Sequence, residues 1–430
     1  MRKYILDLQS REWKSAASFD TSMFRDIELQ QVADEILDSQ LDVLWVITIG
    51  GSIFCKPAVE GGMIYFGCCD KKFYAVSIDG KLVWSFETEG VVVSSPCMAG
   101  NLIVFGSYDF NLYALDKNTG RLAWKFPTRD KIFSAPYTDG KRIYFGSKDG
   151  NFYCVNTEGK LVWSFRTGGP IETHPLIHKG VLYFGSNDQN FYAVEPETGR
   201  LLWKFKTKAA IRHGFATLDD VIYLSGMERT VYGVNAQGRQ VFSFNMGNLN
   251  SASLVARDGI VYIPSRDRNM YAVKPSGEIL WKFKTGHAVE QPSLHNGVLF
   301  FGAEDRNLYA VNALTGQLIW KFSTNGYMPS TPIVHEGVVY MGGWDCNFYA
   351  ISAADGKLLW KFRTSIGTQS TFDMDQVRPE KHFEVIWLPD VEEKEKKKEE
   401  VKISDYGEIK SEYAFTGMGD YLGKKKRGYV

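Results

Sequence analysis

A short phrase centred on tryptophan recurs along the chain every 39 or 40 residues. Eight of its nine copies carry the indole and Phe242 replaces it in the sixth; the tryptophans are Trp45, Trp84, Trp124, Trp163, Trp203, Trp281, Trp320 and Trp360. A period of about 40 residues indicates a propeller or a solenoid. The chain is therefore predicted to be one structural unit repeated many times.

Each copy of the unit reads as a series of short strands. It holds β-branched and aromatic runs separated by Gly, Asp and Asn clusters, with nothing long enough for a helix. In the copy from Ser134 to Phe165, the predicted strands cover residues 134–137, 142–146, 151–155 and 161–165. Four antiparallel strands joined by hairpin turns make one propeller blade.

Complete copies can be counted by the acidic residue in the turn between their second and third strands. There are eight: Asp70, Asp109, Asp149, Asp188, Glu228, Asp267, Asp305 and Asp345. The predicted fold is therefore all-β, an eight-bladed β-propeller of four-stranded antiparallel blades. The acidic residue is interpreted as a turn residue that accepts backbone N–H groups; the alternative is a ring of ligands.

Strand-like segments remain at both ends of the predicted ring. Trp45 precedes the first full copy, and residues 369–373, which resemble an inner strand, follow the last. We expect the N-terminal and C-terminal parts of the chain to pair and close the ring, because closure removes exposed sheet edges. The sequence leaves open whether Trp45 or Trp360 completes the closing blade.

The tryptophan phrases and the turns before them resemble a known motif. The segments ALDKNTGRLAWKF (114–126), AVEPETGRLLWKF (193–205), AVNALTGQLIWKF (310–322) and AISAADGKLLWKF (350–362) are similar to the tryptophan-docking motif of pyrroloquinoline-quinone-like (quinoprotein-type) propeller repeats. That family includes quinoprotein alcohol dehydrogenases and the non-catalytic outer-membrane assembly lipoprotein. The resemblance covers residues 42–365 and is closer to the non-catalytic members, because the large insertions that bury the quinone are missing. It implies the fold and leaves the function open.

Charge and composition narrow the choice of partners. Lys+Arg and Asp+Glu both number 50, so no net field draws the chain to nucleic acid or to a membrane surface. The N-terminal residues lack an apolar core followed by a cleavage site, and no apolar run is long enough to span a membrane. We therefore expect a cytoplasmic, monomeric protein whose partners are proteins rather than nucleic acid.

The six cysteines show neither a CxxC spacing nor a metal-binding pattern with the seven histidines. Cys68 and Cys69 are adjacent, and the family resemblance relates them to the vicinal pair beside the quinone in methanol-type dehydrogenases. The alternative is a neutral replacement, because other copies carry Ser-Lys or Ser-Asn in the same place. A reducing cytoplasm disfavours the disulfide, so we expect no cofactor; pyrroloquinoline quinone with calcium is the alternative.

Four segments of the chain differ in character. Residues 1–40 are an N-terminal segment in which 20–38 are predicted to form an amphipathic helix, either packed on the ring or docking a partner. Residues 41–365 are the propeller and 366–390 the closing strands, with a further strand predicted over 383–388. Residues 391–430 are a charged, Tyr-rich, flexible tail with a basic cluster that is an alternative contact for nucleic acid or a partner.

Candidate contacts lie at the mouth of the central channel, where the loops leading into the inner strands meet the turns between second and third strands. Blade five departs most from the repeat, with Phe242 for tryptophan and Glu228 for aspartate, and a broken local rule often marks a site. Arg212 and His213 are interpreted either as contacts for an anionic ligand or acidic peptide or as ordinary channel groups, and His174 as a satisfied strand residue. The candidates are Glu172, Arg212, His213, Arg229, Arg266, Arg268, Glu290 and Arg306.

The sequence favours a non-catalytic β-propeller scaffold for protein–protein interaction. It shows no phosphate loop, nucleophile elbow or metal motif, so no catalytic residue is assigned. Two alternatives stay open. One is a quinone- and calcium-dependent dehydrogenase, and the other is a propeller that binds a small anionic ligand or peptide at the channel mouth.

Overall fold

The computed structural model describes residues 2–7, 12–15, 51–250, 252–364 and 385–388, and all regular elements among them are β-strands. Contacts divide the chain into two units, residues 49–365 and the combined terminal segments 1–48 and 366–430. The helix predicted over residues 20–38, Trp45 and the tail 391–430 lie outside the described residues. The described part contains no helix long and apolar enough to cross a membrane.

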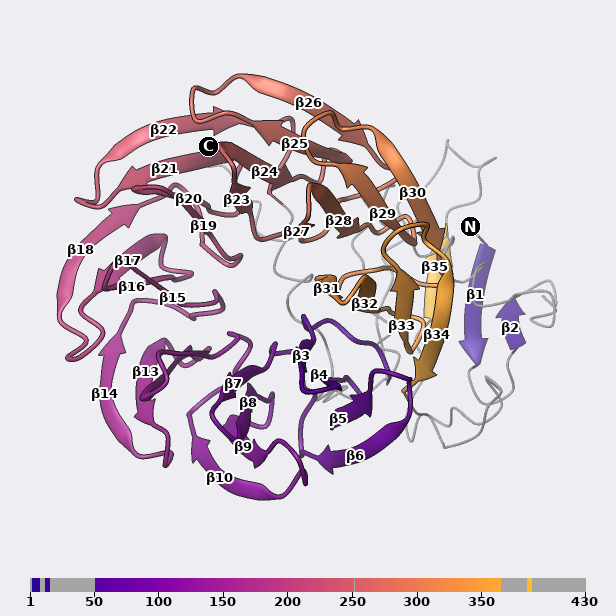
Figure 1. The fold of residues 1–430 in the computed structure, drawn as a ribbon, viewed down its shortest axis with the longest axis horizontal. Helices are drawn as coiled ribbons and strands as arrows, with labels where there is room; N and C mark the ends of the chain where they lie inside the picture. The colour runs from indigo at the N-terminus through magenta and orange to yellow at the C-terminus, as the bar shows by residue number, and fades with distance from the viewer. Residues whose placement is uncertain (1, 8–11, 16–50, 251, 365–384, 389–430) are drawn as a thin grey trace. The chain divides into compact units, whose positions relative to one another are not determined.

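The eight-bladed β-propeller predicted from the repeat is confirmed (Figure 1). Each blade is an antiparallel sheet whose four strands follow one another in the chain. Blades one to four comprise β3 (Ala58–Glu60), β4 (Met63–Gly67), β5 (Lys72–Ser77), β6 (Leu82–Glu87); β7 (Cys97–Ala99), β8 (Leu102–Gly106), β9 (Asn111–Asp116), β10 (Leu122–Pro127); β11 (Tyr137–Thr138), β12 (Arg142–Gly146), β13 (Asn151–Asn156), β14 (Leu161–Arg166); and β15 (Leu176–His178), β16 (Val181–Gly185), β17 (Asn190–Val194), β18 (Leu201–Lys206). Blades five to eight comprise β19 (Ala216–Leu218), β20 (Val221–Ser225), β21 (Thr230–Asn235), β22 (Gln240–Asn245); β23 (Val255–Arg257), β24 (Ile260–Pro264), β25 (Asn269–Val273), β26 (Ile279–Lys284); β27 (Ser293–His295), β28 (Val298–Gly302), β29 (Asn307–Asn312), β30 (Leu318–Ser323); and β31 (Ile333–His335), β32 (Val338–Gly342), β33 (Asn347–Ser352), β34 (Leu358–Arg363).

The terminal segments form a three-stranded sheet of their own. In it β1 (Arg2–Asp7) lies between β2 (Glu12–Ser15) and β35 (Val385–Leu388) and is antiparallel to both. The N-terminal and C-terminal parts of the chain thus pair, but not within a blade. Among the described residues, every blade of the propeller is complete without them.

The second and third strands of each blade supply the core. In blade three, Ile143–Phe145 and Phe152–Val155 are buried, because a neighbouring blade covers each face of the sheet. The outermost strand β14 alternates instead, with Leu161 exposed and Trp163 and Phe165 half-buried. This is why the second and third strands read as continuous apolar runs and the fourth as an alternating one.

The tryptophan of the fourth strand fastens each blade to the next. Its indole Nε1 donates a hydrogen bond of 2.8–3.2 Å to a carbonyl oxygen in the turn before the following blade's fourth strand. Under the indole lies a glycine with a left-handed backbone; at Gly159 (φ 78°), a Cβ would stand 2.7 Å from the Trp124 ring. The seven donor–acceptor pairs are Trp84–Lys117, Trp124–Thr157, Trp163–Pro196, Trp203–Ala236, Trp281–Ala313, Trp320–Ala353 and Trp360–Ile78.

The contact between blades five and six is the exception. Phe242 has no N–H to donate, and a Cβ placed on Gly277, the glycine opposite it, would lie 4.0 Å from the ring rather than against it. The two blades are held instead by a buried apolar cluster that includes Phe242, Phe244, Met246 and Leu254. This junction therefore keeps the packing of the others and loses their hydrogen bond.

The ring closes by the same kind of contact that joins any two blades. Trp360, at the end of blade eight, donates to the Ile78 carbonyl of blade one at 2.8 Å. The rings of Phe348 and Phe66 stack across this junction with centroids 4.3 Å apart. Of the two tryptophans that the sequence left open, Trp360 therefore completes the closing blade.

The acidic residue of each second turn is part of the framework. Asp188 accepts hydrogen bonds from the Tyr192 hydroxyl (2.6 Å) and from the backbone N–H groups of Asn190 (2.9 Å) and Gly168 (2.8 Å). The bond from the tyrosine hydroxyl recurs in all eight blades. These bonds fasten the turn to its third strand and to the loop that leads into the blade, in agreement with the turn interpretation rather than a ring of ligands.

Candidate functional site

The channel mouth is built from two segments of each blade. One is the leading loop, which joins the outermost strand of the previous blade to the innermost strand; the other is the turn between the second and third strands. In every blade the N–H before the acidic residue donates to a carbonyl of the leading loop, as Lys148 does to Lys131 (2.9 Å) and Trp344 to Tyr327 (2.9 Å). Because the innermost strands line the channel of a propeller, these bonds hold loop and turn together at its mouth.

The residue before the acidic one changes from blade to blade, although its backbone bond is constant. We call these the mouth positions: Cys69, Tyr108, Lys148, Asn187, Met227, Arg266, Glu304 and Trp344. The sequence analysis proposed Arg266 from this position as a partner contact. Its other candidates from these turns, Arg229, Arg268 and Arg306, follow the acidic residue instead. The missing signal was the turn register, because only the N–H before the acidic residue faces the leading loop.

The arginines after the acidic residue lie differently from those at the mouth positions. Arg229 and Arg268 are exposed, and Arg306 is half-buried. Arg268 and Arg306 have a left-handed backbone, with φ of 72° and 68°. None of the three forms an ion pair with the glutamates of the mouth among the described residues.

Charged side chains from blades three, four and five meet at one part of the mouth. Glu172, in the leading loop of blade four, has a side chain that is only 9% exposed. Its carboxylate lies 2.8 Å from Lys148 Nζ and 3.7 Å from Arg212 Nε. Both contacts are ion pairs, and the contact with Arg212 is longer than a hydrogen bond. Glu172 therefore links three blades through opposite charges.

A second charged cluster joins blades six and seven. Glu304 contacts His287 Nδ1 closely and lies 3.7 Å from the Arg266 guanidinium. Burial, and then the charge of Glu304, raise the pKa of Glu290 to about 8, so this carboxyl is largely protonated at neutral pH. Burial also opposes ionisation of Glu304, but His287 and Arg266 outweigh it and hold its pKa below the usual range. One of the two neighbouring carboxyls is thus neutral and the other charged.

The imidazole of His213 is affected by the charge of one arginine from each cluster, Arg212 and Arg266. Burial, followed by the charges of Arg266 and Arg212, lowers its pKa to about 4, so the imidazole is neutral at physiological pH. Its Nε2 atom is buried and has no hydrogen-bond partner. Asn250, in the leading loop of blade six, is fully buried, and its Nδ2 atom also lacks a partner. The unsatisfied imidazole of His213 thus lies within the electrostatic reach of two guanidinium groups, whereas Asn250 takes the fully buried register of Ile211 and Val289.

His174 is satisfied within the framework, as the sequence suggested. Its Nδ1 accepts a hydrogen bond from the backbone N–H of Ala135 at 3.2 Å. Burial lowers the pKa of the imidazole to about 4, so the neutral form that this bond requires is the one present. His174 therefore joins the leading loops of blades three and four.

Blades eight, one and two present aromatic side chains at the mouth. The Trp344 ring has its centroid 4.8 Å from that of Tyr327 and 5.6 Å from that of Phe54. The Tyr327 hydroxyl and Trp344 Nε1 are buried without hydrogen-bond partners. Lys131 Nζ, from the leading loop of blade three, lies 5.1 Å from the centre of the Tyr108 ring of blade two, within cation–π range. The mouth therefore has an aromatic side and a charged side.

Cys68 and Cys69 are free thiols, as are the other four cysteines. Cys68 is fully buried in the core shared by blades eight and one, and Cys69 occupies a mouth position. Burial raises the pKa of both thiols well above the usual range, which keeps them protonated. In the described part of the chain, no group of three or more His, Cys, Asp or Glu side chains is placed to hold a metal ion.

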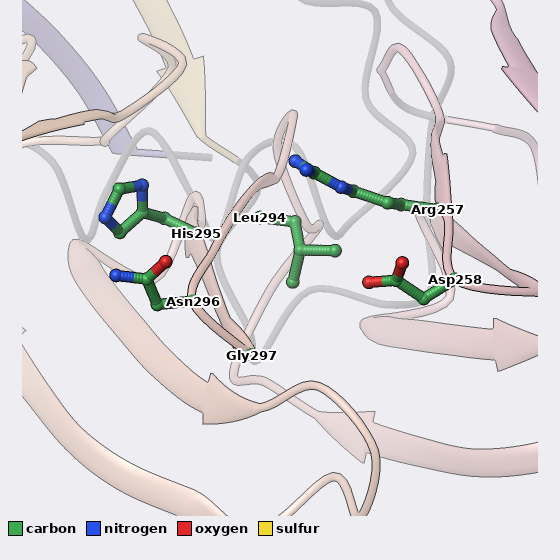
Figure 2. Close-up of a pocket in the computed structure, with 6 residues that line it drawn as sticks. All are labelled: Arg257, Asp258, Leu294, His295, Asn296 and Gly297. Carbon is green, nitrogen blue, oxygen red and sulfur yellow. The ribbon is translucent and has the colours of Figure 1, made fainter.

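The opposite face of the ring carries other polar groups, because successive turns of an antiparallel blade lie at opposite ends of its strands. Figure 2 shows a hollow there, lined by Arg257 and Asp258 of blade six and by residues 294–297 of blade seven. Leu294 lies between the side chains of Arg257 and His295 in this view. Arg257 ends β23, and Leu294 and His295 end β27; the other three residues lie in the turns that follow these first strands, away from the channel mouth.

Comparison with known proteins agrees with the geometry of the ring. The family described as outer membrane protein assembly factor BamB matches residues 40–133, 111–209, 187–287 and 266–380. No curated protein sequence matches the chain. These overlapping matches together span all eight blades.

Two solved structures superpose on most of the chain. The computationally designed Ika8 protein does so with a TM-score of 0.62 at 15% identity, covering 74% of this chain and 98% of that one. BamB from Moraxella catarrhalis has a TM-score of 0.60 at 19% identity and covers 72% and 95%. At such identities the likeness shows the fold alone.

Proposed function

Because the chain belongs to the family of BamB-like β-propellers, we propose that it is a non-catalytic scaffold that binds protein partners at its channel mouth. The family takes its description from an assembly factor for outer membrane proteins. A closed ring of eight blades is a rigid platform, so a partner does not have to order it on binding.

The observation that carries this proposal is the contrast within each second turn. The acidic residue has the same structural role in every blade, because its carboxylate always accepts a hydrogen bond from a tyrosine hydroxyl. The mouth position beside it holds a different side chain in each blade while keeping the same backbone bond. A constant frame that displays varied side chains on one face is how repeat proteins make binding surfaces.

The side chains at the mouth suit a protein interface. Trp344, Tyr108 and Arg266 belong to the residue types that most often dominate binding energy between proteins. The aromatic side offers rigid apolar contact, and the charged side offers electrostatic selection. Their supports, Tyr327 and Glu304, are themselves buried, which fixes the groups in place before a partner arrives.

The proposal extends to the setting and to the rest of the chain. A cytoplasmic location is proposed because all six cysteines are free thiols, as a reducing compartment keeps them. A monomer that does not act on nucleic acid is proposed from the equal numbers of acidic and basic residues. The N-terminal segment 1–40 and the tail 391–430 are proposed as additional contacts.

Capture of partner proteins from an extract of the native cells tests the proposal. The intact chain serves as bait beside the mouth variant Trp344→Ala/Arg266→Gln and the opposite-face control Arg257→Gln. We expect the mouth variant to lose most of the captured protein and the control to keep it, with both melting as the wild type does. Equal capture by all three would place the contact elsewhere, and a bait ending at Pro389 shows whether the tail contributes.

A further inference from the structure

A second set of side chains lies further along each leading loop, toward the innermost strand. Every leading loop is anchored by one backbone bond to a second turn, such as the bond from Ile171 N–H to the Ser147 carbonyl at 3.0 Å. We call the residues three positions after these anchors the channel ring: Lys56, Ser95, Ala135, His174, Gly214, Ser253, Pro292 and Thr331. We propose that the channel ring binds a carboxylate group between Lys56 and His174. This site goes beyond the scaffold function, because it lies inside the channel and needs no protein at the mouth.

The backbone directs the side chains of the channel ring into the channel. Five of the eight residues directly precede a proline, which favours an extended conformation, and successive side chains of an extended chain point to opposite sides. Cys55 is 1% exposed, and Thr173 is fully buried and donates to the Gly185 carbonyl of its own blade at 3.0 Å. The residues that follow them, Lys56 and His174, are exposed and half-buried. Because the buried side faces the blades, Lys56 and His174 face the channel.

The polar side chains of this ring offer donors to the channel, because backbone N–H groups already occupy their acceptors. The Ser95 hydroxyl oxygen accepts the Lys56 N–H at 2.9 Å, and His174 Nδ1 accepts the Ala135 N–H at 3.2 Å. The neutral imidazole of His174 therefore carries its proton on Nε2. Within the part of the chain that the structure describes, neither this N–H nor the Lys56 ammonium donates a hydrogen bond. The two groups thus leave room for a shared acceptor.

The charge of the channel ring favours an anionic acceptor. Lys56 is its only charged member, and it forms no ion pair with any carboxylate of the described residues. Burial lowers the pKa of its ammonium, and no negative charge opposes this shift. Burial, and then the charge of Lys56, lower the pKa of His174, so the ammonium of blade one acts on the imidazole of blade four. Glu172, two residues before His174, is paired with Lys148.

A carboxylate matches both the space and the charge of this site. Gly214, the next member of the ring after His174, has no side chain, and a Cβ placed on it would lie 3.7 Å from His174 Cδ2, the carbon beside Nε2. A carboxylate brings one negative charge to the single ammonium and accepts up to about four hydrogen bonds. A phosphate dianion would bring a second charge that no cation of the ring balances. The carboxylate can belong to a small acid or to the C-terminal end of a polypeptide, which share this chemistry.

Nuclear magnetic resonance of the full chain labelled with ¹⁵N-histidine tests the site, with sodium acetate as the probe. At constant ionic strength, acetate should shift the imidazole signals of His174 until they saturate, and those of His295 on the opposite face should not move. The spectrum of His174→Gln assigns the signals. Lys56→Gln should weaken acetate binding at least about tenfold, a difference of about 1.4 kcal/mol. Lys56→Arg should keep most of the affinity, and Lys125→Gln, at an exposed lysine of an outermost strand, should keep all of it.

Folding does not confound the lysine variants, because Lys56 contributes its backbone N–H to the bond with Ser95 and its side chain holds no other part of the framework; melting temperatures serve as the check. No saturable shift at His174, or equal acetate affinity in the wild type and Lys56→Gln, would refute the site. Chloride that shifts His174 as strongly as acetate at the same concentration would refute the selection of a carboxylate.

A matched pair of peptides identifies the source of the carboxylate. N-acetyl-triglycine that binds more tightly than acetate would favour a chain end, whereas tighter binding of acetate would favour a small acid. Equal binding of N-acetyl-triglycine and its C-terminal amide would contradict the carboxylate site. The site and the scaffold also fail separately, because acetate binding depends on Lys56 and partner capture on the mouth positions.

Discussion

The frame of the ring and the mouth of its channel follow opposite rules, although both come from the same repeat. In the frame, a tryptophan, a left-handed glycine and an acid–tyrosine pair recur with almost no change. At the mouth, the neighbouring position in the same turn changes from Cys69 to Tyr108 to Lys148 along the first three blades. Residues adjacent in sequence therefore divide the work, one fixing the fold and the other free to specify a partner.

The frame itself contains a natural test of its rule. Seven junctions have an indole hydrogen bond, and the junction after blade five has Phe242 instead. The ring tolerates this loss because apolar packing at that junction is retained. The comparison indicates that burial contributes more to the stability of each junction than the hydrogen bond does. Substitutions in the frame should therefore lower stability, and substitutions at the mouth should weaken partner binding.

The largest expected effect comes from removing an indole from the frame. Trp163→Ala deletes the hydrogen bond to Pro196 and the packing on Gly199, and should lower the free energy of unfolding by about 3 kcal/mol. Leu161→Ala, on the same strand and 53% exposed, should cost less than about 0.5 kcal/mol. Urea unfolding measures both. Similar losses in the two variants would contradict the role given to the tryptophan.

A somewhat smaller loss is expected at the acidic turn residue. Asp188→Ala removes acceptors from the Tyr192 hydroxyl and from the N–H groups of Gly168 and Asn190, and should cost about 2 kcal/mol. Asp220→Ala, at an exposed ion pair on the opposite face, is the control and should change stability little. Chemical denaturation followed by tryptophan fluorescence compares them. The frame interpretation would be wrong at this turn if Asp188→Ala were as harmless as its control.

Restoring the missing indole should have a modest stabilising effect. In Phe242→Trp the new N–H would face the turn that follows β25, where the other junctions provide a carbonyl oxygen, and one hydrogen bond contributes about 1 kcal/mol. The converse change, Trp203→Phe, should cost a similar amount by losing its bond to Ala236. Thermal melting of both variants gives the comparison. A destabilised Phe242→Trp protein would show that this junction has repacked around the smaller ring.

The last prediction concerns the dependence of stability on pH, and it belongs to the mouth. The pKa of Glu290 is raised to about 8, so between about pH 4.3 and 8 the folded chain binds a proton that the unfolded chain releases. This carboxyl therefore makes the protein progressively less stable as pH rises through that range. The difference in free energy of unfolding between Glu290→Gln and the wild type should favour the variant more at pH 9 than at pH 5. For the exposed control Glu278→Gln this difference should be the same at both pH values. An unchanged difference at the two pH values would contradict the assignment.

The sequence was sufficient to predict the fold, because the features that specify it are local and repeated. The interval between Trp84 and Trp124 and the acid before Tyr113 recur eight times, so each weak signal is reinforced by its copies. The paired strands β1 and β35 could not be assigned to their own sheet in the same way, because neither belongs to a complete copy of the repeat.

The mouth was only partly predictable, because its groups are positioned by backbone bonds rather than by sequence spacing. Glu172 was found from its leading loop and Arg266 from its turn, but their partners Lys148 and Glu304 were not. Both partners precede the acidic residue of a turn, and the direction in which such a side chain points depends on the N–H bond to the leading loop. The aromatic side was missed for the same reason at Trp344.

Hydrogen–deuterium exchange on the complex with the captured partner shows which face of the ring the partner covers. Binding at the mouth should slow exchange in the leading loops that carry Phe54, Glu172 and Arg212 and in the turns that carry Arg266 and Trp344. Exchange should stay unchanged in the outermost strands and in the turns around Arg257 on the opposite face. Protection confined to the outermost strands, with the mouth unchanged, would show that the partner binds the rim of the ring rather than its mouth.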